Sequence, residues 1–387
     1  MKKRIKEICS FLSRGTSPDY VDESPYKVMN QATFSKGWLD ESNVRFTKKP
    51  TSEANIKKGD LLMASTGGGV LGKVFFYNSD DSSFYADSHV SILRDSRGRY
   101  LMKYLYYYFS TRYDEINATM VKGSTNQTEL QKNYLLAYEI DIPSLTIQQK
   151  IITFLDSKTA EIDNQISLLS KKRDAYMRLK KSIIHCAVTH GLNPDVEMKE
   201  SGVDWIGMIP KHWEIRLLKN MMTIHNGRDY KHIEVDDPEE GYPVIGSGGP
   251  FAFAKEKMYS GEALLLGRKG TIDKPLYWHG SFWTVDTMFY AKPSNLANCK
   301  YMYYLSLNFP FRKIGTQTAL PSMTQTALNC LEVSCPPLTE QQTIADYLDE
   351  KTAKIDAVVS NLDQQIEKYK LLKRALINEV VTGQRAV

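Results

Sequence analysis

The 387-residue sequence has no run of about 18 apolar residues, so no membrane-spanning helix is predicted. Its basic start, MKKRIKEICSF, has an apolar part too short and too charged for a signal peptide. The five cysteines are scattered without a Cys-x-x-Cys pair, which argues against a disulfide framework or a zinc site. We therefore expect a cytoplasmic protein without a membrane partner.

Motifs of common active sites are also missing. The sequence has no His-Glu-x-x-His pattern, no metal-spaced cluster and no Asn-Pro-Pro-aromatic motif of the kind found in amino-methyltransferases. Residues 67–73, GGGVLGK, match most of a phosphate-binding loop, but Val74 stands where Ser or Thr should coordinate magnesium. A glycine-rich turn explains the segment better, so we predict no catalytic residue, no metal site and no cofactor bound by this chain.

Charge alone does not identify a partner. The net charge of +5 is mild for a protein that binds nucleic acid. Residues 1–144 carry 20 Lys and Arg against 17 Asp and Glu, and residues 191–337 carry 15 against 16. Any DNA-binding surface must therefore arise from local placement of side chains rather than from a strongly basic domain.

The strongest pattern is an internal repeat at a constant offset. Residues 143–163, PSLTIQQKIITFLDSKTAEID, match residues 336–356, PPLTEQQTIADYLDEKTAKID, without a gap. Thr146 and Thr339 are predicted N-caps, and apolar residues then recur at steps of three, four and seven. Each copy predicts a long helix, about 40 residues spanning roughly 60 Å, with Gly191 and Gly383 as the expected C-terminal stops.

The apolar stripes of the two helices need a partner. Residues 145–190 carry 8 Lys and Arg against 4 Asp and Glu, whereas residues 338–383 carry 6 against 8. Opposite net charges favour pairing of the helices with each other, although exposed ion pairs contribute little individually. The alternative is that each stripe packs on its own domain.

Weaker similarity connects the segments that precede the helices. GDLL at 59–62 resembles GEAL at 261–264, FYAD at 84–87 resembles WTVD at 283–286, and YLYYY at 104–108 resembles YMYYL at 301–305. Short strands, such as LLMA at 61–64, mixed with helices near 101–115 and 299–312 predict an α+β class. The predicted organisation is a tandem duplication, with these parts: 1–144, a first globular domain; 145–190, a first long helix; 191–337, a second globular domain that opens with a linker at 191–200; 338–383, a second long helix; and 384–387, a tail.

Several of these motifs resemble a known family. The phrases Pro-Ser-Leu-Thr-Ile-Gln-Gln and Pro-Pro-Leu-Thr-Glu-Gln-Gln, each followed by Leu-Asp, Ile-Asp and a closing Val-Thr, resemble the specificity subunits of type I restriction-modification systems. So does IGMIPKHWE at 206–214. The resemblance covers essentially the whole chain.

The resemblance implies a non-catalytic prokaryotic subunit with two target-recognition domains, each reading one half of a bipartite, asymmetric site on double-stranded DNA. It implies that the two long helices form an antiparallel intramolecular coiled coil with pseudo-twofold symmetry. This coiled coil would set the gap between the half-sites and bind two methyltransferase subunits. A restriction subunit that translocates DNA would join the complex. S-adenosylmethionine would be bound by the partner methyltransferase, and ATP and magnesium by the partner nuclease.

Base reading needs Arg or Lys for guanine and Asn or Gln for adenine, and phosphates accept from Lys, Arg and hydroxyls. On this basis the predicted DNA contacts of the first domain are Ser65, Thr66, Lys73, His89, Lys122, Ser124, Thr125, Asn126 and Gln127. Those of the second domain are Arg228, Ser247, Arg268, Lys269, Thr271, Thr316, Gln317 and Thr318. The alternative for each is a loop residue without a DNA role.

Tyrosines at helical spacing (Tyr104, Tyr107 and Tyr108, then Tyr301 and Tyr304) are expected in the core rather than stacked on bases. Two alternative functions stay open from the sequence. One is an enzyme with an unrecognised active site. The other is a coiled-coil scaffold, or a DNA-binding protein outside restriction, whose end domains bind proteins.

Overall fold

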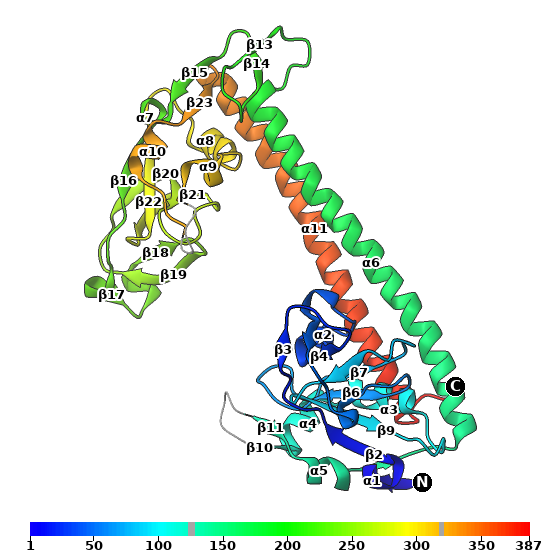
Figure 1. The fold of residues 1–387 in the computed structure, drawn as a ribbon. Coiled ribbons are helices and arrows are strands. Elements are labelled where there is room, and N and C mark those ends of the chain that lie inside the picture. The colour runs from blue at the N-terminus through cyan, green and yellow to red at the C-terminus, as the bar shows by residue number, and fades with distance from the viewer. Residues whose placement is uncertain (123–127, 317–320) are drawn as a thin grey trace. The chain divides into compact units, whose positions relative to one another are not determined.

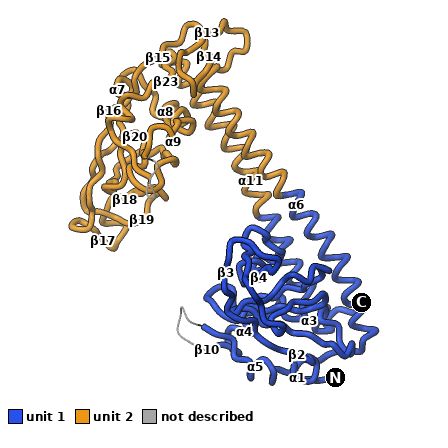
Figure 2. Tube along the Cα trace, in the orientation of Figure 1, with its two compact units in different colours: residues 1–169, 364–387 blue, residues 170–363 orange. Residues whose placement is uncertain are grey.

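The structure is a computed structural model that describes residues 1–122, 128–316 and 321–387. The chain divides into two compact units (Figure 2): unit 1 is Met1–Leu169 with Gln364–Val387, and unit 2 is Ser170–Asp363. Each unit combines a mixed helix-and-sheet globular region with one half of each long helix, as the predicted α+β class requires. Within the described ranges, no helix has the length and apolar character needed to cross a membrane.

Unit 1 has two four-stranded sheets and two smaller strand pairs. Its strands are β1 (Lys2–Arg4), β2 (Phe11–Arg14), β3 (Tyr20–Val21), β4 (Lys27–Met29), β5 (Arg45–Thr47), β6 (Leu61–Ala64), β7 (Val74–Phe76), β8 (Phe84–Ala86), β9 (Val90–Arg94), β10 (Val121–Lys122), β11 (Glu129–Leu130) and β12 (Glu139–Asp141). The sheets have the orders β2-β9-β6-β7 and β3-β5-β4-β8, and β1 pairs with β12 and β10 with β11. Only the β4–β8 pairing is parallel among the described strands of this unit.

Short helices surround these sheets. They are α1 (Ile5–Ile8), α2 (Gln31–Phe34), α3 (Met102–Ser110), α4 (Tyr113–Thr119) and α5 (Lys132–Ala137), with 3-10 turns η1 (Glu41–Asn43) and η2 (Ser52–Ala54). The helix predicted near 101–115 corresponds to α3 and the start of α4. The predicted strand LLMA is β6.

Unit 2 has one seven-stranded sheet and two strand pairs. Its strands are β13 (Met198–Glu200), β14 (Met208–Pro210), β15 (Glu214–Leu217), β16 (Met222–Asn226), β17 (Glu234–Val235), β18 (Tyr242–Gly246), β19 (Gly249–Ala254), β20 (Tyr259–Gly267), β21 (Leu276–Thr284), β22 (Met288–Pro293) and β23 (Glu332–Cys335). Its helices are α7 (Leu218–Met221), α8 (Cys299–Ser306), α9 (Phe311–Ile314) and α10 (Gln325–Asn329), with η3 (Lys231–Ile233) and η4 (Pro238–Glu240). The large sheet has the order β16-β22-β20-β21-β18-β19-β17, β15 pairs with β23 and β13 with β14.

The two globular regions share one topology with a local difference. The sheet order β2-β9-β6-β7 matches β16-β22-β20-β21, and the parallel pair β4–β8 matches β18–β21. The register aligns Phe76 with Tyr277 and Ala86 with Thr284. The first domain has three more residues in this interval, which split one long strand into β7 and β8 and one sheet into two.

The two long helices, α6 (Leu145–His190) and α11 (Leu338–Val381), pair with each other inside each unit (Figure 1). In unit 1, Lys373 Nζ lies 2.6 Å from a carboxylate oxygen of Asp163. In unit 2, Lys180 Nζ lies 2.6 Å from Asp356. An early residue of one helix meets a late residue of the other in both units, so the pairing is antiparallel as predicted. The repeat offset of 193 residues relates Asp163 to Asp356 and Lys180 to Lys373, so the two ion pairs are equivalent under the repeat.

Both ends of the predicted helices can be compared with the structure. Gly191 and Gly383, the expected stops, have φ of 76° and 74°, a left-handed conformation that glycine adopts without a steric cost. The predicted caps Thr146 and Thr339 are wrong, because the helices begin earlier, at Leu145 and Leu338. The predicted domain ranges kept each helix whole, whereas the compact units divide both helices, since each half shares a core with one globular region.

Candidate nucleic-acid interface

The repeated polar residues of the long helices hold the globular regions, and we call their contacts the clasp. In unit 1 the buried side chain of Gln148 accepts a hydrogen bond from the N–H of Leu101 over 3.0 Å. The same amide donates to the carbonyl of Pro143 over 2.8 Å. Asp156 accepts from Tyr107 over 2.5 Å and pairs with Lys103 over 2.6 Å. Gln148 thereby binds two backbone groups of the first domain, and Asp156 binds two of its side chains.

Unit 2 repeats the clasp. The buried Gln341 accepts from the N–H of Asn298 over 2.8 Å and donates to the carbonyl of Pro336 over 2.9 Å. Asp349 accepts from the hydroxyl of Tyr304 over 2.7 Å and pairs with Lys300. Anchoring of the domains therefore explains why this glutamine and this aspartate recur in both copies of the repeat.

The tyrosines belong to the clasp and to the cores. Tyr104 and Tyr301 are fully buried, and their hydroxyls donate to the carbonyls of Val381 and Val188 respectively. Burial raises the pKa of Tyr104 to about 12. The expectation of core packing rather than base stacking is confirmed for these residues.

One edge of each main sheet gathers predicted DNA contacts, and we call it the rim. In unit 1 the N–H of Ser65 donates to the carbonyl of His89 over 2.8 Å. The chain that follows residues 123–127 crosses here, because the N–H of Leu130 donates to Ser65 over 2.8 Å and Thr66 forms a bridge with Glu129. The ends of β2, β6, β9 and β11 thereby meet.

Unit 2 builds the same framework. The N–H of Arg268 donates to the carbonyl of Thr287 over 2.8 Å, and the N–H of Met323 donates to Arg268 over 2.8 Å. Lys269 forms a bridge with Ser322. These contacts and the strand registers define rim equivalents, which are Arg14 and Asn226, Ser65 and Arg268, Thr66 and Lys269, His89 and Thr287, and Glu129 and Ser322.

The side chains of the first rim are ordered by local contacts. Arg14 donates from Nε to the carbonyl of Ser88 over 2.9 Å and forms an ion pair with Glu129. Thr66 Oγ1 lies 2.7 Å from Nδ1 of His89. Both pairs present polar atoms at the surface, which a groove of DNA could contact.

Ser65 differs from these neighbours. Its side chain is fully buried, and its hydroxyl lies 2.6 Å from that of Ser91. A hydroxyl enclosed in this way does not reach a base or phosphate at the surface, so the placement argues against Ser65 as a DNA contact.

The second rim is more basic. Arg268 is half-buried, donates from Nη1 to the carbonyl of Asp286 over 3.3 Å, and lies over the ring of Phe289. Lys269 and Arg228 are exposed. A cavity of about 560 Å³ lies beside Arg228, lined in part by Asn226. Positive charge and hydrogen-bond donors are thus concentrated at this edge.

The remaining candidates lie in several places. Lys73 and Thr271 are half-buried next to the rim strands, and Ser247 is half-buried in the turn between β18 and β19. Lys122 is exposed in β10, and Thr316 shares a hydrogen bond with Ser322 over 2.9 Å. Six predicted contacts lie outside the described residues: Ser124, Thr125, Asn126, Gln127, Gln317 and Thr318.

The DNA contacts predicted from the sequence did not include Arg14, Asn226 or Glu129. A usable signal was the polar residue before glycine, Arg14-Gly15 and Asn226-Gly227. A Cβ at either glycine would lie only 2.0 Å from a backbone oxygen, so the chain needs glycine directly after the side chain that reaches the rim.

A buried carboxyl group lies behind the first rim. Asp87 is almost fully buried and accepts from the N–H of His89 over 2.8 Å. Burial raises the pKa of this carboxyl group, and the hydrogen bond only partly offsets the effect.

Among the residues that the structure describes, no cluster of His, Cys, Asp and Glu could hold a metal ion.

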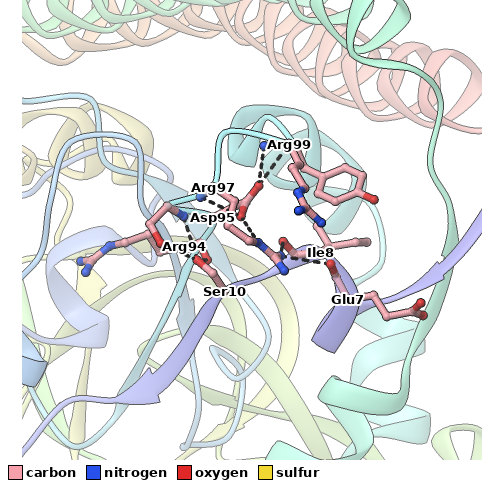
Figure 3. A network of polar contacts seen from close by, with 9 residues as sticks. Glu7, Ile8, Ser10, Arg94, Asp95, Arg97 and Arg99 are labelled. Carbon is pink, nitrogen blue, oxygen red and sulfur yellow. Dashed lines mark hydrogen bonds and ion pairs between the residues drawn. The ribbon is translucent and has the colours of Figure 1, made fainter.

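The opposite end of β9 forms a turn that a network of polar contacts closes (Figure 3). The carboxylate of Asp95 accepts from the N–H groups of Arg97, Arg99 and Tyr100. Arg97 donates onward to the carbonyls at the end of α1. This network fixes the turn, and the side chain of Arg97 has a structural role in it.

Comparison with known proteins identifies the family. The model of the type I restriction modification DNA specificity domain matches residues 1–169 and 210–368. The chain belongs to this family. The MjaVIII specificity subunit of a type I restriction enzyme from Methanocaldococcus jannaschii is 22% identical over 376 residues, covering 88% of this chain and 82% of the relative.

A second protein of that organism, named as an MjaX specificity subunit, is 22% identical over 416 residues, covering 98% of this chain and 92% of the relative. A solved chain described under complex assembly and conformational transition of the type I R-M system has a TM-score of 0.72 at 14% identity. That match covers 98% of this chain and 97% of the other, and it supports the fold.

Proposed function

We propose that this specificity-family member is the DNA-recognition subunit of a type I restriction-modification complex. Each globular region reads one half of a bipartite, asymmetric DNA site through its rim. The observation that carries this proposal is the pair of rims, which share one backbone framework but present different side chains. One framework with two surfaces suits two half-sites of different sequence.

The partners follow from the same proposal. The paired helices set the gap between the half-sites and dock two methyltransferase subunits, because the 193-residue repeat offers two similar surfaces. A restriction subunit completes the complex for cleavage. S-adenosylmethionine is bound by the methyltransferase, ATP and magnesium by the nuclease, and the complex is located in a prokaryotic cytoplasm. This chain contributes recognition without catalysis.

A domain exchange tests the proposal. The second globular region, residues 191–337, is replaced by the corresponding region of another specificity subunit and expressed with the cognate methyltransferase. Methylome sequencing should show one half-site changed, with the other half-site and the gap retained. Lengthening α6 and α11 by equal helical insertions should lengthen only the gap.

Other outcomes would decide against the proposal. A change in both half-sites would show that the domains do not read independently. Methyl transfer by the isolated chain from S-adenosylmethionine to DNA would favour the enzyme alternative. DNA binding without sequence preference or salt dependence would favour the scaffold alternative.

A further inference from the structure

We propose that Arg14 is the guanine-reading side chain of the first target-recognition domain. It determines specificity at one base pair of the first half-site, and the second domain has no equivalent contact. The inference rests on the proposed function.

Arg14 is held at the rim from two directions. Its Nε donates to the carbonyl of Ser88, and its Nη1 forms the ion pair with Glu129. Arg14 is the last residue of β2, and the following Gly15 packs against the backbone of residues 86–87 with no room for a Cβ. The side chain therefore leaves a rigid strand end and is restrained along its length.

This restraint leaves the guanidinium group available. The two contacts use two of its five N–H donors, and the side chain keeps 32% of its surface exposed. Guanine presents O6 and N7 in the major groove, and a guanidinium group donates to both at once. An arginine oriented before binding loses little conformational entropy when it does so.

Glu129 acts as a positioning residue. Its carboxylate fixes the plane of the guanidinium group and comes from β11, whose partner β10 lies on the other side of residues 123–127 in the chain. A phosphate contact would not need this arrangement, since a carboxylate beside the guanidinium repels phosphate oxygens. The local charge therefore favours a neutral base edge over the DNA backbone.

Unit 2 lacks the pair. Asn226 stands at the position of Arg14 and Ser322 at that of Glu129. Asn226 is exposed and lines the cavity of about 560 Å³, and its side chain is too short to follow the path of Arg14. A guanine contact of this geometry is thus specific to the first half-site.

The experiment uses the assembled complex with its methyltransferase and duplexes of the site found by methylome sequencing. Each guanine of the first half-site is replaced singly by 7-deazaguanine, which lacks N7. The native complex should lose affinity at one guanine by on the order of 10- to 100-fold. Arg14→Gln should abolish this sensitivity at that guanine, while discrimination in the second half-site persists and shows that the complex is folded.

Arg99→Gln is the matched control, because Arg99 is exposed on the same domain at the opposite end of β9. It should keep the guanine sensitivity. The inference is overturned if the native complex tolerates 7-deazaguanine throughout the first half-site, or if Arg14→Gln retains the sensitivity. It is also overturned if Arg14→Gln weakens all sequences equally with a lower salt slope, which is the behaviour of a phosphate contact. Absence of sequence-specific binding by the native complex would instead refute the proposed function itself.

Discussion

The two globular regions agree where they meet the helices and differ where they face outward. The clasp uses the same residue types in both units. A buried glutamine binds two backbone groups in unit 1 and three in unit 2, and an aspartate binds a lysine and a tyrosine. The rim keeps the same backbone hydrogen bonds but exchanges nearly every side chain. Attachment and recognition are thus separated within one small domain.

The difference has a physical reason. A buried polar residue has one satisfactory set of partners, so its identity is constrained by the groups that it must satisfy. A rim side chain faces solvent, and its replacement costs the fold little. A duplicated domain can therefore acquire a new DNA target at the rim while it retains the same attachment to the helices.

The clasp gives the largest expected effect on stability. Gln148→Leu leaves the N–H of Leu101 and the carbonyl of Pro143, both partly buried, without the side-chain amide that they bind. We therefore expect unit 1 to lose roughly 2 to 4 kcal/mol of unfolding free energy. Gln341→Leu should destabilise unit 2 by at least as much, because Gln341 makes the equivalent two contacts and also donates to the carbonyl of Leu296 over 2.9 Å. Urea unfolding followed by hydrogen exchange in α3 and α8 measures each unit separately.

The neighbouring glutamine provides the control. Gln149 is exposed one position further along α6, and Gln149→Leu should change stability by less than about 0.5 kcal/mol. An effect of Gln148→Leu as small as that of Gln149→Leu would show that the clasp contributes nothing. A smaller effect of Gln341→Leu than of Gln148→Leu would break the equivalence of the units.

For the clasp, the sequence predicts the helices but not the contacts that their polar residues make. The repeat at offset 193 predicted two paired helices, and the turn glycines predicted their ends. The role of Gln148 was not predicted, since only the fold brings the N–H of Leu101 to it. In the domains, the comparison of FYAD with WTVD paired Ala86 with Val285. The strand registers pair Ala86 with Thr284 instead, so the alignment by residue type was shifted by one residue.

The candidate site was predictable only in part. Thr66, His89, Arg268 and Lys269 were found because they follow or precede apolar strands in glycine-rich or polar turns. Burial of Ser65 could not be foreseen, since it depends on the hydroxyl of Ser91 on the adjacent strand. Arg14 is far from the other rim residues in the chain, and its ion pair with Glu129 is a product of the tertiary structure.

Behind the rims, a buried charge gives a second, smaller difference between the units. Asp87 of unit 1 corresponds to Val285 of unit 2. The folded-state pKa of Asp87 is raised above its ordinary value of 3.8, so its ionised form destabilises the fold at neutral pH. The penalty disappears as the pH falls through the raised pKa, and below 3.8 both states are protonated.

Asp87→Asn should therefore stabilise unit 1 at neutral pH, because the amide oxygen still accepts from the N–H of His89. The difference from the native chain should shrink as the pH is lowered towards 4, as measured by urea midpoints between pH 4 and 8. Asp22→Asn, at an exposed position of the same unit, should show no such trend. A less stable Asp87→Asn variant at neutral pH would mean that the carboxylate is needed in its ionised form.

The helix ion pairs give the smallest expected effect and the most direct test of equivalence. Lys373→Ala and Lys180→Ala each remove one partly exposed interhelical pair, for about 0.2 to 1 kcal/mol, and the loss should fade in 1 M salt. Lys171→Ala, at an exposed position on α6, is the control. Double-mutant cycles with Asp163→Ala and Asp356→Ala isolate the coupling energies.

The two ion pairs should have equal coupling energies, because the repeat offset of 193 residues relates one pair to the other. The ion pair of Arg173 with Asp363 in unit 2 has no such equivalent, because Ile366 and Ser170 occupy the corresponding positions. Coupling found in only one unit would mean that the helices follow the pseudo-twofold symmetry in sequence but not in energy.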